Sequence, residues 1–282
     1  MRTTIALFSL VILWGWSGAA ESIFPKGWTE TAVLIQHPAG GGSGFFLQHS
    51  NKIFLVTAKH VIFDRTKFPS LVLVATNATC TTWSERTNIS SHFTIDLAGS
   101  FTARETRGHP SRDVAVSYVG ISETNGIRQS DFTKQAGLTR PAIQLVIAND
   151  HTTLFKDVLV GSDIYTFGYP SSIGLQGAPQ VDQARPLVRR GIVADKDPGR
   201  RTLVLDSPAF KGNSGGPVLE RGVTEFTGTN VQWHFKVIGV VVEFIPFEER
   251  WANNQFGYWN TTISNSGYSI AEPMDSVFEV VW

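Results

Sequence analysis

The sequence predicts an all-β protein, built as a barrel or a sandwich of short antiparallel strands. Runs rich in β-branched and aromatic residues occur along most of the chain, and turn residues interrupt them every ~8 to 15 residues. The 282 residues include 26 glycines, which suits a fold with many tight turns. Long apolar repeats with the 3.6-residue period of a helix are scarce. An architecture in which strands alternate with long helices is therefore not expected.

Eight runs are predicted as strands, at residues 31–37, 44–49, 52–58, 70–76, 113–119, 157–169, 201–207 and 236–247. Helical structure is expected in a single turn near residues 132–138 and in a short C-terminal helix within residues 274–282. The segment from residue 139 to residue 158 is predicted to connect two halves of similar size. We place these halves at residues 21–145 and 146–282.

Residues 1–20 have the layout of a secretory signal peptide. A basic start is followed by an apolar run from Ile5 to Trp16 and by small residues before Glu21. A retained membrane anchor is the alternative, but the apolar run is shorter than the roughly 20 residues that a spanning helix needs. We therefore expect a secreted or periplasmic protein with no integral membrane segment after the signal is removed.

Charge and cysteine content limit the possible partners and the sources of stability. Lys plus Arg and Asp plus Glu both total 24, so no overall field attracts nucleic acid, and no nucleic-acid partner is expected. Cys80 is the only cysteine, so the chain cannot form an internal disulfide. A lone cysteine could be a nucleophile or an intermolecular link. Because no histidine lies close to it in the sequence, we interpret Cys80 as a buried or incidental thiol.

The stretch "FKGNSGGPVL", residues 210–219, surrounds one serine with glycines. Glycine is used where the backbone takes a positive φ or approaches another group closely. A serine hydroxyl is a weak nucleophile at neutral pH unless a base, normally histidine, lies beside it. Ser214 is therefore a candidate nucleophile that requires a histidine and a carboxylate elsewhere in the chain.

His60 and Asp113 are the best candidates for these partners. In "FLVTAKHVI" an apolar run leads through Thr57, Ala58 and Lys59 to His60, so His60 is expected at the end of a strand, where a cleft can form. Asp113 begins the alternating run "DVAVSYV", which predicts a partly buried carboxylate in need of a hydrogen-bond donor. Asp96 is the competing carboxylate and ranks behind Asp113.

Three blocks, "TAKHV", "RDVAV" and "GNSGGPV", occur in this order, and together they resemble the trypsin-like (chymotrypsin-fold) serine proteases. The pattern is most similar to bacterial members without disulfides, such as the Htr/Deg protease domain. The resemblance implies two antiparallel six-stranded β-barrels with a cleft between them. It also implies a serine endopeptidase that cleaves polypeptides and needs no metal or organic cofactor.

The resemblance gives each block a role in catalysis. Ser214 corresponds to the nucleophile that is acylated, His60 to the general base, and Asp113 to the carboxylate that orients the imidazole. The loop residues Gly212, Asn213 and Ser214 correspond to the oxyanion hole, with the amides of Gly212 and Ser214 as its donors.

The same resemblance predicts the substrate pocket. Pro208 stands where trypsin itself carries a pocket acid, and Val240, Val241 and Val242 are expected near the pocket wall. Apolar or small P1 side chains are therefore expected, unless Glu243 faces the cleft. Asn213 replaces the Asp that pairs with a new N-terminus in digestive relatives, so activation by that route is not expected.

The sequence is also compatible with two other functions. "GNSGG" also fits the nucleophile elbow of α/β-hydrolases, but that elbow leads into a helix and has its histidine later in the chain. Here Pro217 and a strand-like run follow, and His234 is the only later histidine. A catalytically silent protease fold that binds peptides or a partner is the second alternative, although all three candidate residues are present.

Two further sets of residues are given structural interpretations. Six histidines in polar or turn-like contexts are predicted at the surface: His37, His49, His92, His109, His151 and His234. Four tryptophans are interpreted as core or interface packing rather than as ligand platforms: Trp233, Trp251, Trp259 and Trp282.

Overall fold

The structure is a computed structural model of the chain. It describes residues 24–282, apart from residues 26, 125, 136–144, 172–176, 228–229 and 254. The predicted signal peptide lies outside the described residues. Within the described ranges, no helix is both long and apolar enough to cross a membrane.

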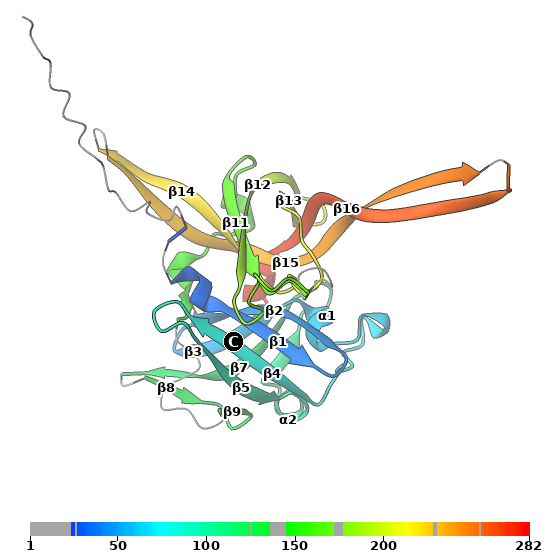
Figure 1. The fold of residues 1–282 in the computed structure, drawn as a ribbon. Coiled ribbons are helices and arrows are strands. Elements are labelled where there is room, and N and C mark those ends of the chain that lie inside the picture. The colour runs from blue at the N-terminus through cyan, green and yellow to red at the C-terminus, as the bar shows by residue number, and fades with distance from the viewer. Residues whose placement is uncertain are drawn as a thin grey trace, which may run out of the picture.

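The first half of the chain forms one ten-stranded sheet (Figure 1). Its main path runs in the order β6-β7-β3-β2-β1-β4-β5-β9, while β8 pairs with β7 and β10 pairs with β2. The strands are β1 (Ala32–His37), β2 (Gly40–His49), β3 (Lys52–Thr57), β4 (Asn77–Ser84), β5 (Ile89–Asp96), β6 (Thr106–Gly108), β7 (Ala115–Glu123), β8 (Gly126–Gln129), β9 (Thr133–Gln135) and β10 (Ile147–Ala148).

The second half forms a closed six-stranded barrel in the order β11-β12-β13-β16-β15-β14. Its strands are β11 (Asp163–Gly168), β12 (Leu187–Asp197), β13 (Thr202–Asp206), β14 (Pro217–Thr227), β15 (Asn230–Asn253) and β16 (Tyr258–Pro273). All of its neighbouring strands are antiparallel. Two pairs, β14 with β15 and β15 with β16, continue beyond the barrel as long arms on opposite sides (Figure 1).

Helices are short and few in the described part of the chain. The α-helices are α1 (Lys59–Ile62), α2 (Leu97–Thr102) and α4 (Met274–Phe278), and the 3-10 helices are η1 (Trp28–Thr31), η2 (Arg65–Lys67), η3 (Asn149–His151) and η4 (Phe155–Asp157). The predicted short C-terminal helix is present as α4.

The predicted fold class is confirmed, with a correction to the first half. The predicted second barrel has its six strands and is closed. The first half has ten strands, and its edge strands β6 and β9 do not pair with each other. The excess comes from short strands such as β8, β9 and β10, which have two to four residues each and were too short to stand out as apolar runs. β10 joins the first sheet at residues 147–148, and the predicted division at residue 145 stays a prediction.

Three predicted elements differ from the structure. Residues 70–76 are not a strand, because Val72 and Val74 form backbone bonds with Asp64 and Ile62 instead of a sheet ladder. The segment begun by Thr133 is strand β9 rather than a helical turn, and residues 136–138 lie outside the described residues. Strands β4 and β5 were missed because polar residues, mainly Ser and Thr, interrupt their apolar residues, so neither contains a continuous apolar run.

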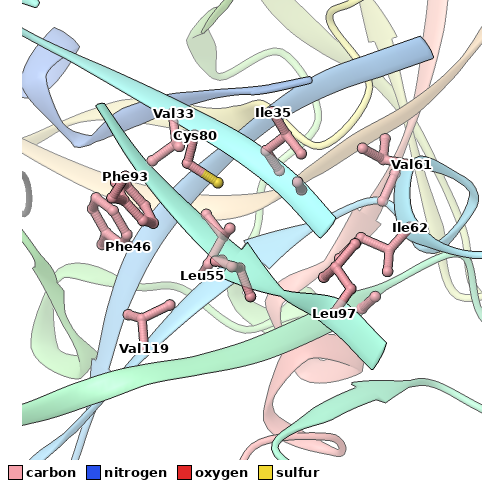
Figure 2. Packing of buried hydrophobic residues seen from close by; sticks show 14 of the residues in the cluster. Val33, Ile35, Phe46, Leu55, Val61, Ile62, Cys80, Phe93, Leu97 and Val119 are labelled. Carbon is pink, nitrogen blue, oxygen red and sulfur yellow. The ribbon is translucent and has the colours of Figure 1, made fainter. Parts of the chain in front are cut away.

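Three apolar clusters hold the fold together. The first lies mainly within the ten-stranded sheet and includes Phe46, Leu55, Phe93 and Cys80, together with Val242 of β15 (Figure 2). The third fills the second barrel. The second joins the two halves, since it packs residues of β2, β3 and β7 against residues of β11, β14, β15 and α4. This shared cluster fixes the halves relative to each other, and the candidate site lies where they meet.

Candidate active site

His60 lies where the first sheet gives way to a single helical turn. Strand β3 ends at Thr57, whose hydroxyl donates to the Ser43 carbonyl at 2.6 Å, and α1 begins two residues later. The side chain of Asp113 holds His60 twice: its Oδ1 accepts the His60 amide at 2.9 Å, and its Oδ2 lies 2.7 Å from Nδ1. Both side chains are largely buried, at 22% and 17% exposure.

The Asp113 carboxylate fixes the tautomer of His60. Burial alone raises the pKa of Asp113, but the hydrogen bonds from the His60 side chain and backbone and the nearby positive charge of Arg65 outweigh it, so the pKa lies below its ordinary value. An ionised carboxylate only accepts hydrogen bonds, which assigns the proton to Nδ1. Nε2 of the neutral ring is then a hydrogen-bond acceptor.

Ser214 lies in a loop that only glycine can form at two of its positions. Gly212 and Gly215 have φ values of +94° and +91°, in the left-handed region. A Cβ at Gly212 would lie 2.3 Å from the Tyr169 carbonyl oxygen, and one at Gly215 would lie 1.9 Å from that of Ser43. The Gly215 amide also donates to the Val241 carbonyl at 2.7 Å, which fastens the loop to β15.

Ser43 ties this loop to the first half and was not singled out from the sequence. Its amide donates to the Ser214 carbonyl at 2.8 Å, and its hydroxyl donates to the Gly212 carbonyl at 2.7 Å. The same hydroxyl accepts the Tyr169 amide at 2.8 Å. Because Ser43 also accepts from Thr57, one residue of β2 links the serine loop to the strand that leads to His60.

The predicted oxyanion loop contains two free amides. The N–H groups of Gly212 and Ser214 donate to no other residue that the structure describes. The Asn213 amide is used within the loop, where it donates to the Phe210 carbonyl at 2.9 Å, while the Asn213 side-chain oxygen accepts the Phe210 amide. Asn213 therefore shapes the loop, and its own N–H is not available to a ligand, contrary to its inclusion among the predicted oxyanion residues.

His60 and Ser214 line one pocket of about 290 Å³. The remaining lining residues are Arg65, Ala209, Phe210, Lys211, Val241, Val242, Glu243 and Phe244. The structure thus brings the predicted base, its carboxylate partner and the predicted nucleophile to one place where the two halves meet. Asp96, the competing carboxylate, instead accepts the Gly99 amide at the start of α2.

The predicted pocket residues separate into two groups. Val241 and Val242 both line the pocket, because a β-bulge between Val241 and Glu243 interrupts the alternation of side chains along β15. Val240 is completely buried in the cluster that joins the halves, and Pro208 does not line the pocket. Neither is therefore placed to touch a ligand there.

Glu243 lines this pocket. The expected preference for apolar or small P1 side chains depended on whether this carboxylate faces the cleft. Its carboxylate lies 3.2 Å from the Arg65 guanidinium, and both side chains are about half exposed. Arg65 belongs to η2 in the first half and Glu243 to β15 in the second. The ion pair therefore links the two halves beside His60.

A second hollow, of about 420 Å³, adjoins the serine loop. Gly212, Lys211 and Tyr169 line it, together with the glycines at residues 40–42 of β2. Lys211 lines both hollows. A chain that crosses the loop at Ser214 can therefore occupy space on both sides of it.

A charged cluster behind Asp113 was also missed in the sequence. Glu272 of β16 accepts the Asp113 amide at 3.4 Å, and its carboxylate lies 3.9 Å from the Arg112 guanidinium. Burial raises the pKa of Glu272, against the effects of these two neighbours. Lys59 is almost completely buried, and its Nζ donates to the His109 carbonyl at 2.9 Å. Burial lowers the pKa of Lys59, and the charges of Asp113 and Glu272 oppose that shift.

The prediction that His109 lies at the surface is wrong. Its ring is buried, its Nδ1 accepts the Ser111 and Arg112 amides, and its Nε2 lies 2.6 Å from the Glu279 carboxylate. His109 thus shapes the loop that ends at Asp113. The burial of His109 could not be predicted from its local sequence, because its partner Glu279 lies near the C-terminus.

Comparison with known proteins agrees with this arrangement. The family model of the trypsin-like peptidase domain matches residues 42–223. The chain belongs to the trypsin-like peptidase family. The matched region includes His60, Asp113 and Ser214, and runs from β2 to β14. A search of curated proteins finds no match.

Several solved structures are similar to this trypsin-like peptidase. Deg5 is 16% identical, with a TM-score of 0.44 over 89% of this chain and 87% of that one. The thermostable serine protease AL20 from an extremophilic microorganism is 13% identical, with a TM-score of 0.47 over 89% and 95% of the two chains. A human pathogenic astrovirus serine protease is 17% identical, with a TM-score of 0.39 over 87% and 90%.

Proposed function

We propose that this chain is a serine endopeptidase in which Ser214, His60 and Asp113 form the catalytic triad. The observation that carries the proposal is that the His60 ring, held 2.7 Å from Asp113, lines the same pocket as Ser214. Membership of a peptidase family supports polypeptides as the substrate class.

In the proposed reaction, His60 Nε2 takes the Ser214 hydroxyl proton as Oγ attacks the scissile carbonyl carbon. Asp113 stabilises the imidazolium that forms, and the amides of Gly212 and Ser214 donate to the developing oxyanion. His60 then gives the proton to the leaving amine as the peptide C–N bond breaks, which leaves an acyl-enzyme on Ser214. Water, deprotonated by His60, releases the acyl group and restores the serine.

The pocket beside Ser214 favours apolar or small P1 side chains. Val241, Val242 and Phe244 supply apolar surface, and the Glu243 carboxylate is paired with Arg65 rather than open to a substrate cation. A fluorogenic peptide library that varies P1 should therefore show a preference for apolar over basic residues.

The N-terminal sequence supports export as part of the same proposal, with removal of residues 1–20. N-terminal sequencing of the protein recovered from the periplasm or the medium should begin near residue 21. Recovery of an intact Met1 terminus would contradict it.

Ser214→Ala tests the proposed activity. Loss of the nucleophile should lower kcat on casein by at least about 10³-fold with little change in Tm, because only the hydroxyl is removed. The matched control is Ser90→Ala on β5, a serine away from the cleft, which should retain wild-type kcat. Undiminished cleavage by Ser214→Ala would refute the assignment.

A further inference from the structure

Beyond the barrel, β15 and β16 continue as a two-stranded ribbon, which we call the outer ribbon: residues 244–253 of β15 and 258–267 of β16. Their pairing runs out to Asn253 and Tyr258. Ten residues of extended chain span about 33 Å, so the tip lies far from the barrel. Figure 1 shows this ribbon in orange, reaching well past the rest of the fold.

The outer ribbon carries large apolar side chains that the rest of the molecule does not cover. Trp251 and Trp259 are 61% and 77% exposed, and Phe256, in the turn between the two strands, is 71% exposed. The other exposed apolar residues of the ribbon are Phe244, Phe247, Tyr258 and Ile263. Trp251 and Trp259 were interpreted as core or interface packing, and their exposure excludes the core.

Both faces of the outer ribbon are apolar in part. Trp251 pairs with Asn260, and Asn253 pairs with Tyr258, which puts Trp251 and Tyr258 on one face. Trp259 pairs with Ala252 and lies on the other face, as does Ile263. A two-stranded ribbon is marginally stable alone in water, and exposed apolar surface of this extent is typical of an interaction site.

The base of the outer ribbon is part of the candidate active site. Phe244, its first residue, lines the pocket that contains His60 and Ser214. The Asn265 side chain donates to the carbonyl of Ala209, another residue of that pocket. The base of the outer ribbon is thus continuous with the pocket.

The outer ribbon also offers free backbone. In the described part of the chain, residues 244–253 pair only with β16, so their other edge has no partner strand. An extended peptide can add to such an edge through main-chain hydrogen bonds. Because β15 runs outward from the pocket, an antiparallel added strand would place the residues N-terminal to the scissile bond along the ribbon.

We propose that the outer ribbon is a docking surface for the substrate itself: an extended polypeptide segment, rich in apolar side chains, N-terminal to the scissile bond. This inference rests on the proposed peptidase function. Continuity with the pocket favours the substrate over a second copy of the chain. A bound substrate must pass the base of the ribbon, whereas a second copy need not. The ribbon's charged side chains, Glu248, Glu249 and Arg250, give a net negative charge, which disfavours an anionic lipid surface.

The test compares long and short substrates on the double variant Trp251→Ser/Trp259→Ser. The short substrate is a fluorogenic hexapeptide, and the long one is the same peptide extended by ten residues of apolar-rich sequence on its N-terminal side. KM for the extended peptide should rise about tenfold, while kcat/KM for the hexapeptide should change less than about twofold. A peptide extended on its C-terminal side serves as the directional control and should behave like the hexapeptide. Ile89→Ser, which replaces an apolar residue of β5 that is 59% exposed, should leave all three values unchanged.

Binding separates failure of this inference from failure of the proposed function. In the Ser214→Ala background, fluorescence polarisation with the labelled extended peptide should show a Kd about tenfold weaker in the ribbon variant. If the wild type cleaves nothing but this difference is found, the peptidase proposal fails and the docking surface stands. Equal KM and Kd in the ribbon variant and its parent would overturn the docking surface. So would a wild-type dimer in sedimentation that the variant abolishes without any change in KM, since a second copy would then be the occupant.

Discussion

At the scale of single residues, the Arg65–Glu243 pair controls how strongly the pocket attracts a charged substrate side chain. Two opposite charges lie 3.2 Å apart at the edge of the pocket that His60 and Ser214 line. Each neutralises the other's field within that pocket, although solvent screens both because they are half exposed. The pair therefore keeps Glu243 from acting as an anchor for a basic substrate side chain.

Arg65→Ala should release that anchor. With Glu243 unpaired, kcat/KM for substrates with Lys or Arg at P1, relative to Leu, should rise roughly 3- to 10-fold. P1 profiling with a fluorogenic library measures the ratio. Arg65→Lys keeps the charge and should leave the ratio near its wild-type value, so a rise in that variant, or none in Arg65→Ala, would show that the pair does not control specificity.

Residue chemistry was also the part most open to prediction from the sequence. His60, Asp113 and Ser214 stand at strand ends or among glycines, and these local signals survive in a single sequence. Lys59, His109 and Glu272 carry no such signal, because their contacts join residues far apart in the sequence: Lys59 donates to the His109 carbonyl, His109 pairs with Glu279, and Glu272 accepts the Asp113 amide. Cys80, by contrast, is a core residue as interpreted: it is fully buried, and burial raises the pKa of its thiol.

At the scale of elements, the serine loop depends on the backbone conformation of its glycines. Gly212 combines a positive φ with a close approach to the Tyr169 carbonyl, so a side chain there strains the loop in two ways. We therefore predict that a side chain at Gly212 displaces the two free amides, those of Gly212 and Ser214, that are proposed to face the oxyanion.

Gly212→Ala should lower kcat by about 10²- to 10³-fold and reduce the free energy of unfolding by about 1–3 kcal/mol. The matched control is Gly161→Ala, which has a similar φ of +89° but open space around its Cβ position. That variant should lose about 1 kcal/mol and keep its kcat. Equal kcat losses in the two variants would mean that the loop geometry at Gly212 is not what matters.

Elements were predicted unevenly, and the reasons are physical. Apolar strands such as β3 and β7 were found because most of their residues are buried, which gives short runs rich in apolar and β-branched residues. The run at residues 70–76 has the same composition but no partner strand, so it stayed outside the sheet. The outer ribbon was missed because local pattern does not show where a strand pair leaves the barrel.

At the scale of the whole molecule, one apolar cluster shared by both halves holds the candidate site in register. Ser43 reinforces this link, since it bonds the serine loop to the strand that precedes His60. The site therefore exists only when both halves are folded against each other, and conditions that weaken the fold should weaken activity with it.

Acid should destabilise the molecule partly through Asp113. Its folded pKa lies below the ordinary value of 3.8, so its contribution to stability is present above that value and is lost as the pH falls through the folded pKa. Urea unfolding at about pH 6 and about pH 3 should show a smaller acid-induced loss in Asp113→Asn than in wild type. Asp195→Asn, at an exposed aspartate of β12, should keep the wild-type loss. An unchanged pH dependence in Asp113→Asn would contradict the charged pairing with His60.

The central claim is that folding brings Ser214 and His60 together into a reactive pair. The most direct measurement is labelling of the folded protein with a fluorophosphonate, followed by mass spectrometry of the modified peptide. We predict one adduct, on Ser214, which is lost in Ser214→Ala and strongly slowed in His60→Ala, while Ser90→Ala is labelled like the wild type. An unlabelled Ser214 in folded protein, or labelling at an equal rate without His60, would contradict the account.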